Sequence, residues 1–256
     1  MIKNALKKLY LAVLLIFMYA PIITLIILSF NSSKSRARWG GFTLVWYQNL
    51  LSDEAVLSAL INTLSIAILA TIFSTIMGTV ACIAMIGQSS RMRSLIMGVT
   101  NIPMINADIV TGISLMLLFR FLHLGSGFVT ILLAHITFDI PFVMLSVIPR
   151  IKNMNFYVYE AALDLGATPV YAFYKTIMPD IWPGVMSGAL MAFTMSIDDF
   201  IITYFTKGSG FETISTLIYN EVKRGIQPEI YALSAIIFVV VLALLMIVYR
   251  TPAKKK

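Results

Sequence analysis

The sequence predicts an all-α polytopic membrane protein with six transmembrane helices and with both termini in the cytoplasm. Composition is the first reason: 59% of the 256 residues are hydrophobic and 12% are charged, and the mean hydropathy is +0.89. A soluble core of this size cannot bury so much apolar surface. The second reason is that the apolar residues form six stretches of spanning length, and the third is the uneven distribution of positive charge between the loops.

Each of the six stretches reaches the length of about 20 apolar residues that a helix needs to cross a bilayer. They cover residues 9–30, 59–86, 95–122, 127–147, 184–205 and 230–249. The first stretch is longer than a signal-peptide core and lacks a small-x-small cleavage site. We therefore interpret it as an uncleaved span.

Positive charge sets the expected orientation of these spans. The loops and tails on the side of the termini carry 12 of the 19 Lys and Arg residues, and the opposite side carries 7. Because cytoplasmic loops are enriched in Lys and Arg, both termini are expected in the cytoplasm. This bias also explains the net charge of +7, so the basic composition does not indicate a partner nucleic acid.

The chain divides into three predicted parts. Residues 1–57 hold the first span and an outer loop, residues 58–250 form a transmembrane core, and residues 251–256 are a basic cytoplasmic tail. No loop is long enough for a separate soluble domain, so soluble machinery must come from other chains. The single cysteine, Cys82, lies in an apolar run, which excludes a disulfide framework or a cysteine-based metal site within this chain.

The longest cytoplasmic loop, residues 150–183, is expected to form two short helices. Apolar residues at positions 158, 161, 162 and 165 have helical spacing and would form one face of an amphipathic helix. Asn155 can cap the start of this helix, Gly166 can end it, and Thr168 followed by a proline can begin a second helix. Pro179 and Pro183 are expected to break the chain before the fifth span.

Such a loop could lie on lipid or dock on a protein. Glu160 and Asp164 do not give the basic polar face of a helix that binds anionic lipid. A protein partner is therefore the better interpretation.

The same loop carries a family resemblance. Glu160-Ala161-Ala162, Gly166 and Pro179 resemble the EAA loop of bacterial ABC importer permeases, with Thr176 and Met178 departing from the Ile and Leu that are usual there. The resemblance implies the type I ABC importer permease fold. It also implies that these five residues couple the chain to a separate ATPase subunit.

The chain has no phosphate-binding loop of its own. The segment "GATPVYAFYKT" ends in Lys-Thr but lacks the second glycine and the spacing of such a loop. The resemblance thus places ATP and Mg on a partner subunit, with no cofactor on this chain, which is then not itself an enzyme.

Four acidic residues lie inside predicted spans: Asp108, Asp139, Asp198 and Asp199. An aspartate at the bilayer centre costs about 2.5 to 3.5 kcal/mol, so such residues face a cavity or a partner. The spans contain no Lys or Arg at comparable depth. The compensating charge must come from a proton, a neighbouring chain or the substrate, and a column of carboxylates suits an elongated polycation.

Some of these carboxylates have alternative interpretations. If the fifth span ends early, Asp198 and Asp199 lie at the wet interface. Asp139 could pair with His135, one helical turn earlier, or share its proton.

The stretch "SIDDFIITYFTKG" around Asp198 and Asp199 resembles polyamine permeases within the same family, in particular the second permease subunits of spermidine/putrescine transport systems. The resemblance implies import of spermidine and putrescine across the bacterial inner membrane, with Asp108, Asp198 and Asp199 as substrate contacts. It also implies a homologous second permease, two ATPase subunits and a periplasmic polyamine-binding protein as partners. The segment 207–229 could help to dock that binding protein, or it could be an ordinary solvated loop.

A self-contained, proton-coupled cation carrier is the alternative function. Such carriers usually show internal repeats, and the sequence contains no convincing one. Nor would such a carrier explain the displayed EAA loop.

Overall fold

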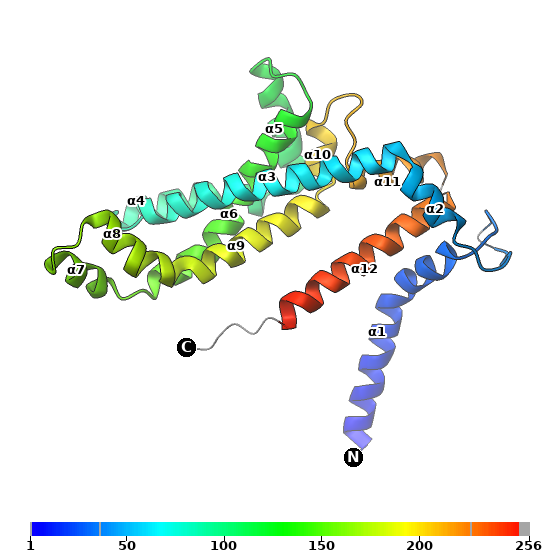
Figure 1. The fold of residues 1–256 in the computed structure, drawn as a ribbon, viewed down its shortest axis with the longest axis horizontal. Helices are drawn as coiled ribbons and strands as arrows, with labels where there is room; N and C mark the ends of the chain where they lie inside the picture. The colour runs from blue at the N-terminus through cyan, green and yellow to red at the C-terminus, as the bar shows by residue number, and fades with distance from the viewer. Residues whose placement is uncertain (1, 36, 226, 251–256) are drawn as a thin grey trace. The chain divides into compact units, whose positions relative to one another are not determined.

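The computed structural model describes residues 2–35, 37–225 and 227–250, and helices make up most of these residues (Figure 1). An isolated antiparallel bridge joins Asn31 and Phe42. The predicted all-α class is therefore confirmed. The chain forms two compact units, one comprising Met1–Leu57 with Leu217–Lys256 and the other Ser58–Thr216. The division predicted from the sequence stays a prediction, and its basic tail, 251–256, lies outside the described residues.

The first unit is built around its terminal helices. Helix α1 packs against α12, and α12 packs against α2. Polar contacts secure the segment after α1: the Ser29 and Tyr47 hydroxyls are 2.6 Å apart, and the Trp46 indole N–H donates to the Asn31 carbonyl at 2.8 Å. The helices of this unit are α1 (Ile2–Ser29), α2 (Val45–Ser52), most of α11 (Ile214–Arg224) and α12 (Pro228–Arg250).

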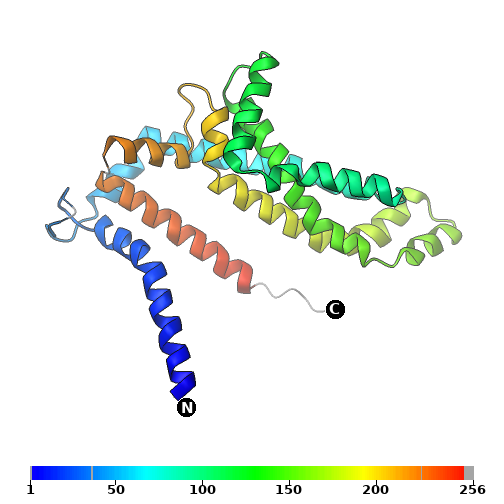
Figure 2. The same cartoon turned by 180° about the vertical axis from the view of Figure 1, so that it is seen from behind.

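The second unit contains long helices and two places where one helix ends and the next begins within a few residues, at 105–108 and at 198–201 (Figures 1 and 2). Its elements are most of α3 (Glu54–Ala84), then α4 (Ser90–Ile105), α5 (Asp108–Phe121), α6 (Phe128–Lys152), α7 (Phe156–Asp164), α8 (Pro169–Ala172), the π-helical turn η1 (Phe173–Ile177), α9 (Met178–Asp198) and α10 (Ile201–Thr206).

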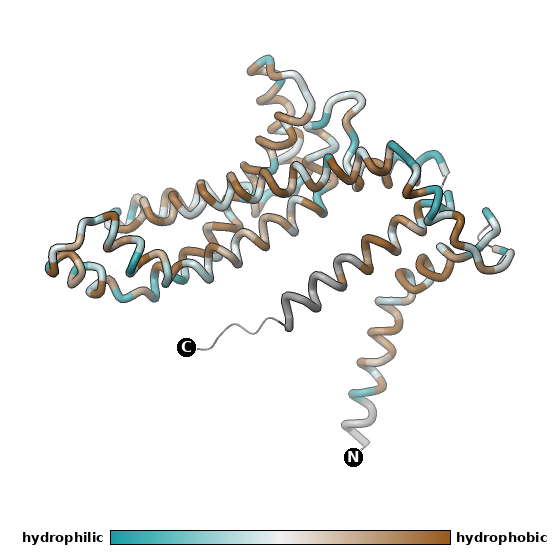
Figure 3. Tube along the Cα trace, viewed as in Figure 1, coloured by the Kyte–Doolittle hydropathy of each residue, from teal (hydrophilic) through white to brown (hydrophobic). Residues whose placement is uncertain are grey.

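Several helices have the length and composition of membrane spans. These are Lys7–Ser29 within α1, and α3 and α6 over their full lengths. Hydrophobic residues run along most of α3 (Figure 3). A fourth span results if α4 and α5, which meet at 106°, are counted together. The total of six spans and the cytoplasmic position of the termini stay predictions.

Small residues bring α6 and α9 close together. A methyl group added at Gly184 would lie 2.8 Å from the Ser146 carbonyl oxygen, and one at Gly188 would lie 3.0 Å from the Val143 Cα. Glycines four residues apart on one helix allow this approach of backbones, as in many membrane helix pairs. The buried side chains of α6 and α9 around this contact, including Val143 and Ile181, form the main core of the unit.

We expect Gly188→Ala to destabilise the protein by about 1 to 3 kcal/mol, because the added methyl group would lie 3.0 Å from the Val143 Cα and 3.2 Å from its carbonyl oxygen, so this backbone would have to shift. Gly98→Ala is the matched control, since Gly98 is also helical and has nothing within 4 Å of an added methyl group. The control is expected to leave stability unchanged or slightly raised. The thermal unfolding midpoint in detergent measures both. An equal midpoint for the two variants would contradict the close packing of α6 and α9.

Candidate functional site

The loop between α6 and α9 forms the two short helices that the sequence predicts. The Asn155 side chain accepts a hydrogen bond from the Tyr157 N–H at 3.1 Å and caps α7. Gly166 follows α7 with a φ of +87°. The Thr168 side chain accepts from the Tyr171 N–H at 3.4 Å and caps α8. These local predictions are confirmed.

Most of the residues that resemble the EAA motif are exposed to solvent. Glu160 and Ala161 are exposed on α7, Ala162 is half-buried, and Gly166 is exposed just after the helix. Pro179, also exposed, lies at the start of α9. The motif residues therefore lie on an accessible part of the unit, on or beside the short helices.

The predicted chain break at Pro179 and Pro183 is wrong. Both prolines lie within helical structure, since α8 leads through η1 into α9 with helical dihedrals at each junction. A proline removes one backbone N–H and clashes with the preceding turn of a regular α-helix. The π-helical turn Phe173–Ile177 ends two residues before Pro179 and changes the hydrogen-bond register there, so the helix continues past this proline.

One helix interruption carries Asp108. Asn106 and Ala107 are extended between α4 and α5, with ψ angles of 150° and 137°. Asp108 is the first residue of α5 and is exposed. The sequence places Asp108 near the middle of a single span, whereas the structure places it at a bend of 106°.

A second interruption carries Asp198 and Asp199. Helix α9 ends at Asp198, which is exposed, and α10 begins at Ile201. Asp199 has an extended backbone, with a ψ of 126°, and its side chain is only 9% exposed. The alternative of an early end to the fifth span is thus partly realised, because α9 stops here but a further helix follows.

Asp199 is held by the start of α10. Its Oδ1 accepts from the Ile202 N–H at 3.2 Å, and its Oδ2 accepts from the Thr203 N–H at 2.7 Å and the Thr203 hydroxyl at 2.8 Å. The Asp199 carboxylate therefore caps α10, whose first N–H groups have no partner inside the helix.

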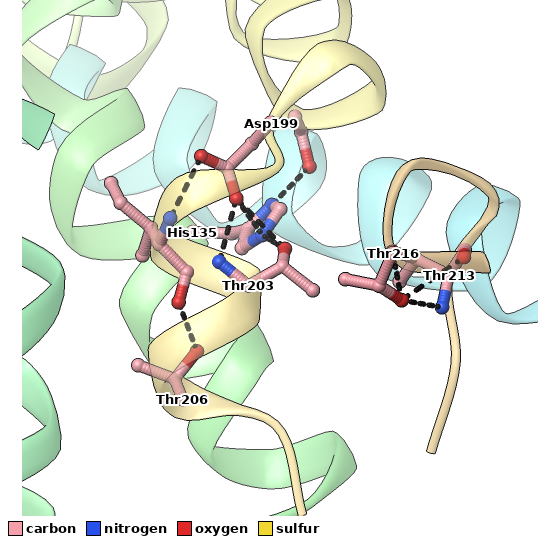
Figure 4. Close-up of polar contacts among 8 residues, drawn as sticks. His135, Asp199, Thr203, Thr206, Thr213 and Thr216 are labelled. Carbon is pink, nitrogen blue, oxygen red and sulfur yellow. Dashed lines mark hydrogen bonds and ion pairs between the residues drawn. The ribbon is translucent and has the colours of Figure 1, made fainter. Parts of the chain in front are cut away.

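His135 of α6 joins this group of polar side chains (Figure 4). Its Nδ1 lies 2.6 Å from the Ser196 hydroxyl, and its Nε2 lies 2.9 Å from the Thr203 hydroxyl and 3.5 Å from the Asp199 Oδ2. The imidazole thus contacts both α9 and α10. The sequence did not reveal this network.

The suggested pairing of Asp139 with His135 is wrong. Both ring nitrogens of His135 are used toward α9 and α10 instead. Asp139 is wholly buried, and neither of its carboxylate oxygens has a hydrogen-bond partner within the described part of the chain.

The two interruptions lie in neighbouring helices of the same unit. Helix α5 packs against α10, and Figures 1 and 2 show them side by side. Gly112 on α5 permits this contact, since an added methyl group would lie 3.2 Å from the Phe205 side chain and 3.4 Å from the Ile202 Cα. Asp108 is thus an exposed carboxylate at the start of α5, and Asp198 is one at the end of α9, three residues before α10 begins.

These two carboxylates are not neutralised by the described residues. The ion pairs Lys207–Glu212 and Arg224–Glu221 and the contact of the His135 ring with Asp199 leave Asp108 and Asp198 without a cationic partner among the described residues. In the described ranges there is also no group of three or more His, Cys, Asp and Glu residues that could hold a metal ion. A groove of about 550 Å³ lies between α3 and the η1–α9 segment, and none of the four carboxylates lines it. The chemistry available at the interruptions is attraction of a cation by free carboxylates.

Comparison with known proteins places this arrangement in a family. Residues 70–252 match the family described as "Binding-protein-dependent transport system inner membrane component". The chain is 36% identical over 97% of its length to the spermidine/putrescine transport system permease protein PotC of Escherichia coli (strain K12), of which 93% is covered. It is 38% identical over 86% of its length to the putrescine transport system permease protein PotI of the same strain, of which 81% is covered.

A solved structure has the same fold. It is a chain of a bacterial ABC transporter involved in the import of the acidic polysaccharide alginate, with a TM-score of 0.72 and 18% identity over 97% of this chain and 93% of that one. A second structure of an alginate transporter, in complex with an alginate-bound periplasmic protein, gives a TM-score of 0.68 at 19% identity, over 97% and 92% of the two chains. The helical architecture, the short helices displayed between α6 and α9 and the family match agree, and the chain belongs to the inner membrane components of binding-protein-dependent ABC import systems.

Proposed function

We propose that this protein is the second permease subunit of an ATP-driven importer that moves polyamines, such as spermidine and putrescine, across the bacterial inner membrane. The observation that supports this most directly is the pair of exposed carboxylates, Asp108 and Asp198, at two helix interruptions that pack together. The relatives named for spermidine and putrescine transport support the same substrate class.

Electrostatics favours a cationic substrate. An exposed carboxylate within a span cannot face lipid without a large penalty, so Asp108 and Asp198 face water or a partner chain. Each carboxylate in turn would attract an ammonium group of the substrate, whereas both would repel an anion. The alginate transporter has this fold and imports an acidic polysaccharide, so the fold alone does not fix the charge of the substrate.

The remaining partners follow from the same proposal. A homologous second permease completes the path, two ATPase subunits bind ATP and Mg at the cytoplasmic face, and a periplasmic polyamine-binding protein delivers the substrate. The segment 207–229 is a candidate for contact with that binding protein. Both termini lie in the cytoplasm, and the protein is a multi-pass component of the membrane.

The displayed loop is the proposed point of coupling. ATP-driven closure of the ATPase subunits would move the segment from Glu160 to Gly166, and η1 and α9 would carry that movement toward Asp198, because they form one helical path with α8. The substrate path would then open alternately to the two sides of the membrane.

Uptake of labelled spermidine tests this function. The chain is expressed with its partner subunits in cells that lack other polyamine importers, and uptake is compared with that of cells lacking only this chain. We expect ATP-dependent uptake that unlabelled putrescine inhibits and sulfate does not. Uptake that persists without the ATPase but collapses with the proton gradient would favour the proton-coupled carrier.

A further inference from the structure

We infer that Asp199, His135 and Thr203 form a positioning network, which holds the neighbouring Asp198 in the orientation in which it contacts the substrate. The inference rests on the proposed polyamine function and assigns different roles to the two adjacent carboxylates. Asp198 meets an ammonium group, whereas Asp199 fixes the helix interruption from which Asp198 projects.

Asp199 has little capacity left for a substrate. A carboxylate offers about four lone-pair sites on its two oxygens. Three of them accept hydrogen bonds from Ile202 and Thr203, which leaves one site on Oδ1. The His135 Nε2 lies 3.5 Å from Oδ2, the oxygen that already accepts both bonds from Thr203. Asp199 is also only 9% exposed, while Asp198 is exposed. The geometry therefore separates a satisfied carboxylate from a free one.

The hydrogen-bond directions in the network can be assigned from its chemistry. The Thr203 hydroxyl donates its single proton to Asp199, which can only accept. The Thr203 oxygen must then accept from His135 Nε2, 2.9 Å away, so Nε2 carries a proton. In the neutral imidazole Nδ1 is consequently an acceptor, and the Ser196 hydroxyl donates to it at 2.6 Å. Every polar group in this network thus has a defined partner.

The network anchors the chain on both sides of Asp198. Ser196 precedes it by two residues and is 3% exposed, and Asp199 follows it directly. Both are tied to the same imidazole on α6. Successive residues of a helix are turned by about 100°, so Asp198 points away from α6 when Ser196 points toward it. Loss of the anchor would leave the Asp198 carboxylate present but free to turn out of position.

A double-mutant cycle tests whether the network acts through Asp198. Thr203→Val removes the hydroxyl but keeps the Thr203 N–H that Asp199 accepts, and Thr203→Ser keeps both donors. Thr206→Val is the matched control, because Thr206 is a buried threonine of the same helix whose hydroxyl donates to the Ile202 carbonyl, outside the network. Each variant is made in the wild-type and the Asp198→Asn chains, and uptake of spermidine is measured at equal membrane levels.

In the wild-type background we expect Thr203→Val to raise the apparent KM for spermidine about tenfold with little change in kcat, the size expected for one hydrogen bond to a charged group. Thr203→Ser and Thr206→Val are expected to stay near wild type. In the Asp198→Asn background, Thr203→Val is expected to have no further effect. An equal effect in both backgrounds would overturn the positioning role, since the threonine would then only support the fold. A wild-type transporter without spermidine uptake would instead refute the proposed function.

Discussion

Asp198→Asn is expected to lower kcat/KM for spermidine uptake about 100-fold. The substitution keeps the size of the side chain and removes the charge that would meet an ammonium group. Truncating one partner of a desolvated charge pair typically costs about 2 to 5 kcal/mol, or about 30-fold to several thousand-fold, a range that includes this factor. Asp108→Asn, at the other interruption, is expected to act in the same direction. Initial rates of labelled-spermidine uptake measure both effects.

Asp180→Asn is the control for this prediction. Asp180 is an exposed aspartate in the first turn of α9, while Asp198 is the last residue of the same helix. Its loss should leave uptake close to wild type. Membrane levels and the amount of copurified ATPase are matched in all variants. Unchanged uptake in both Asp108→Asn and Asp198→Asn would remove the proposed cation path and leave only the family assignment.

Gly166→Ala is expected to abolish most ATP-driven uptake and to reduce copurification of the ATPase. Gly166 has a φ of +87°, a conformation that costs a residue with a Cβ about 1 to 2 kcal/mol. Nothing lies within 4 Å of an added methyl group, so the strain is confined to the backbone. The turn between α7 and α8 would open and misplace Glu160 against its partner.

Gly87→Ala provides an equivalent backbone strain elsewhere. Gly87 follows α3, has a φ of +83° and also has nothing within 4 Å of an added methyl group. The two variants should therefore lose similar stability, but only Gly166→Ala should lose the ATPase. Equal retention of the ATPase by both variants would contradict the coupling role of the loop.

The sequence predicts best what depends on neighbouring residues. The caps at Asn155 and Thr168 and the turn at Gly166 were predictable, because each signal acts within three or four residues. The continuation of the helix through Pro179 was not, because it depends on a π-helical turn that no simple residue pattern marks.

The candidate site was predictable only in part. Charge in an apolar span draws attention to Asp108, Asp198 and Asp199 without any structure. Their different environments depend on tertiary contacts, since His135 meets Ser196 and Thr203 across 61 and 68 residues of sequence. A histidine in the fourth span and hydroxyl residues beside Asp199 in the fifth were the available signal, but no spacing rule connects residues so far apart.

The central claim is that the Asp198 carboxylate meets an ammonium group of the substrate. The most direct measurement compares kcat/KM for spermidine with that for spermidine acetylated on one terminal amine, in wild type and in Asp198→Asn. Acetylation removes one charge and keeps the chain of the substrate, and the same binding protein serves both transporters. Each terminal amine is acetylated in turn, and the ratio of kcat/KM for spermidine to kcat/KM for the acetylated form is measured in both transporters. For the amine that Asp198 meets, this ratio should be large in wild type and should fall toward one in Asp198→Asn. An unchanged preference for both acetylated forms would contradict the account.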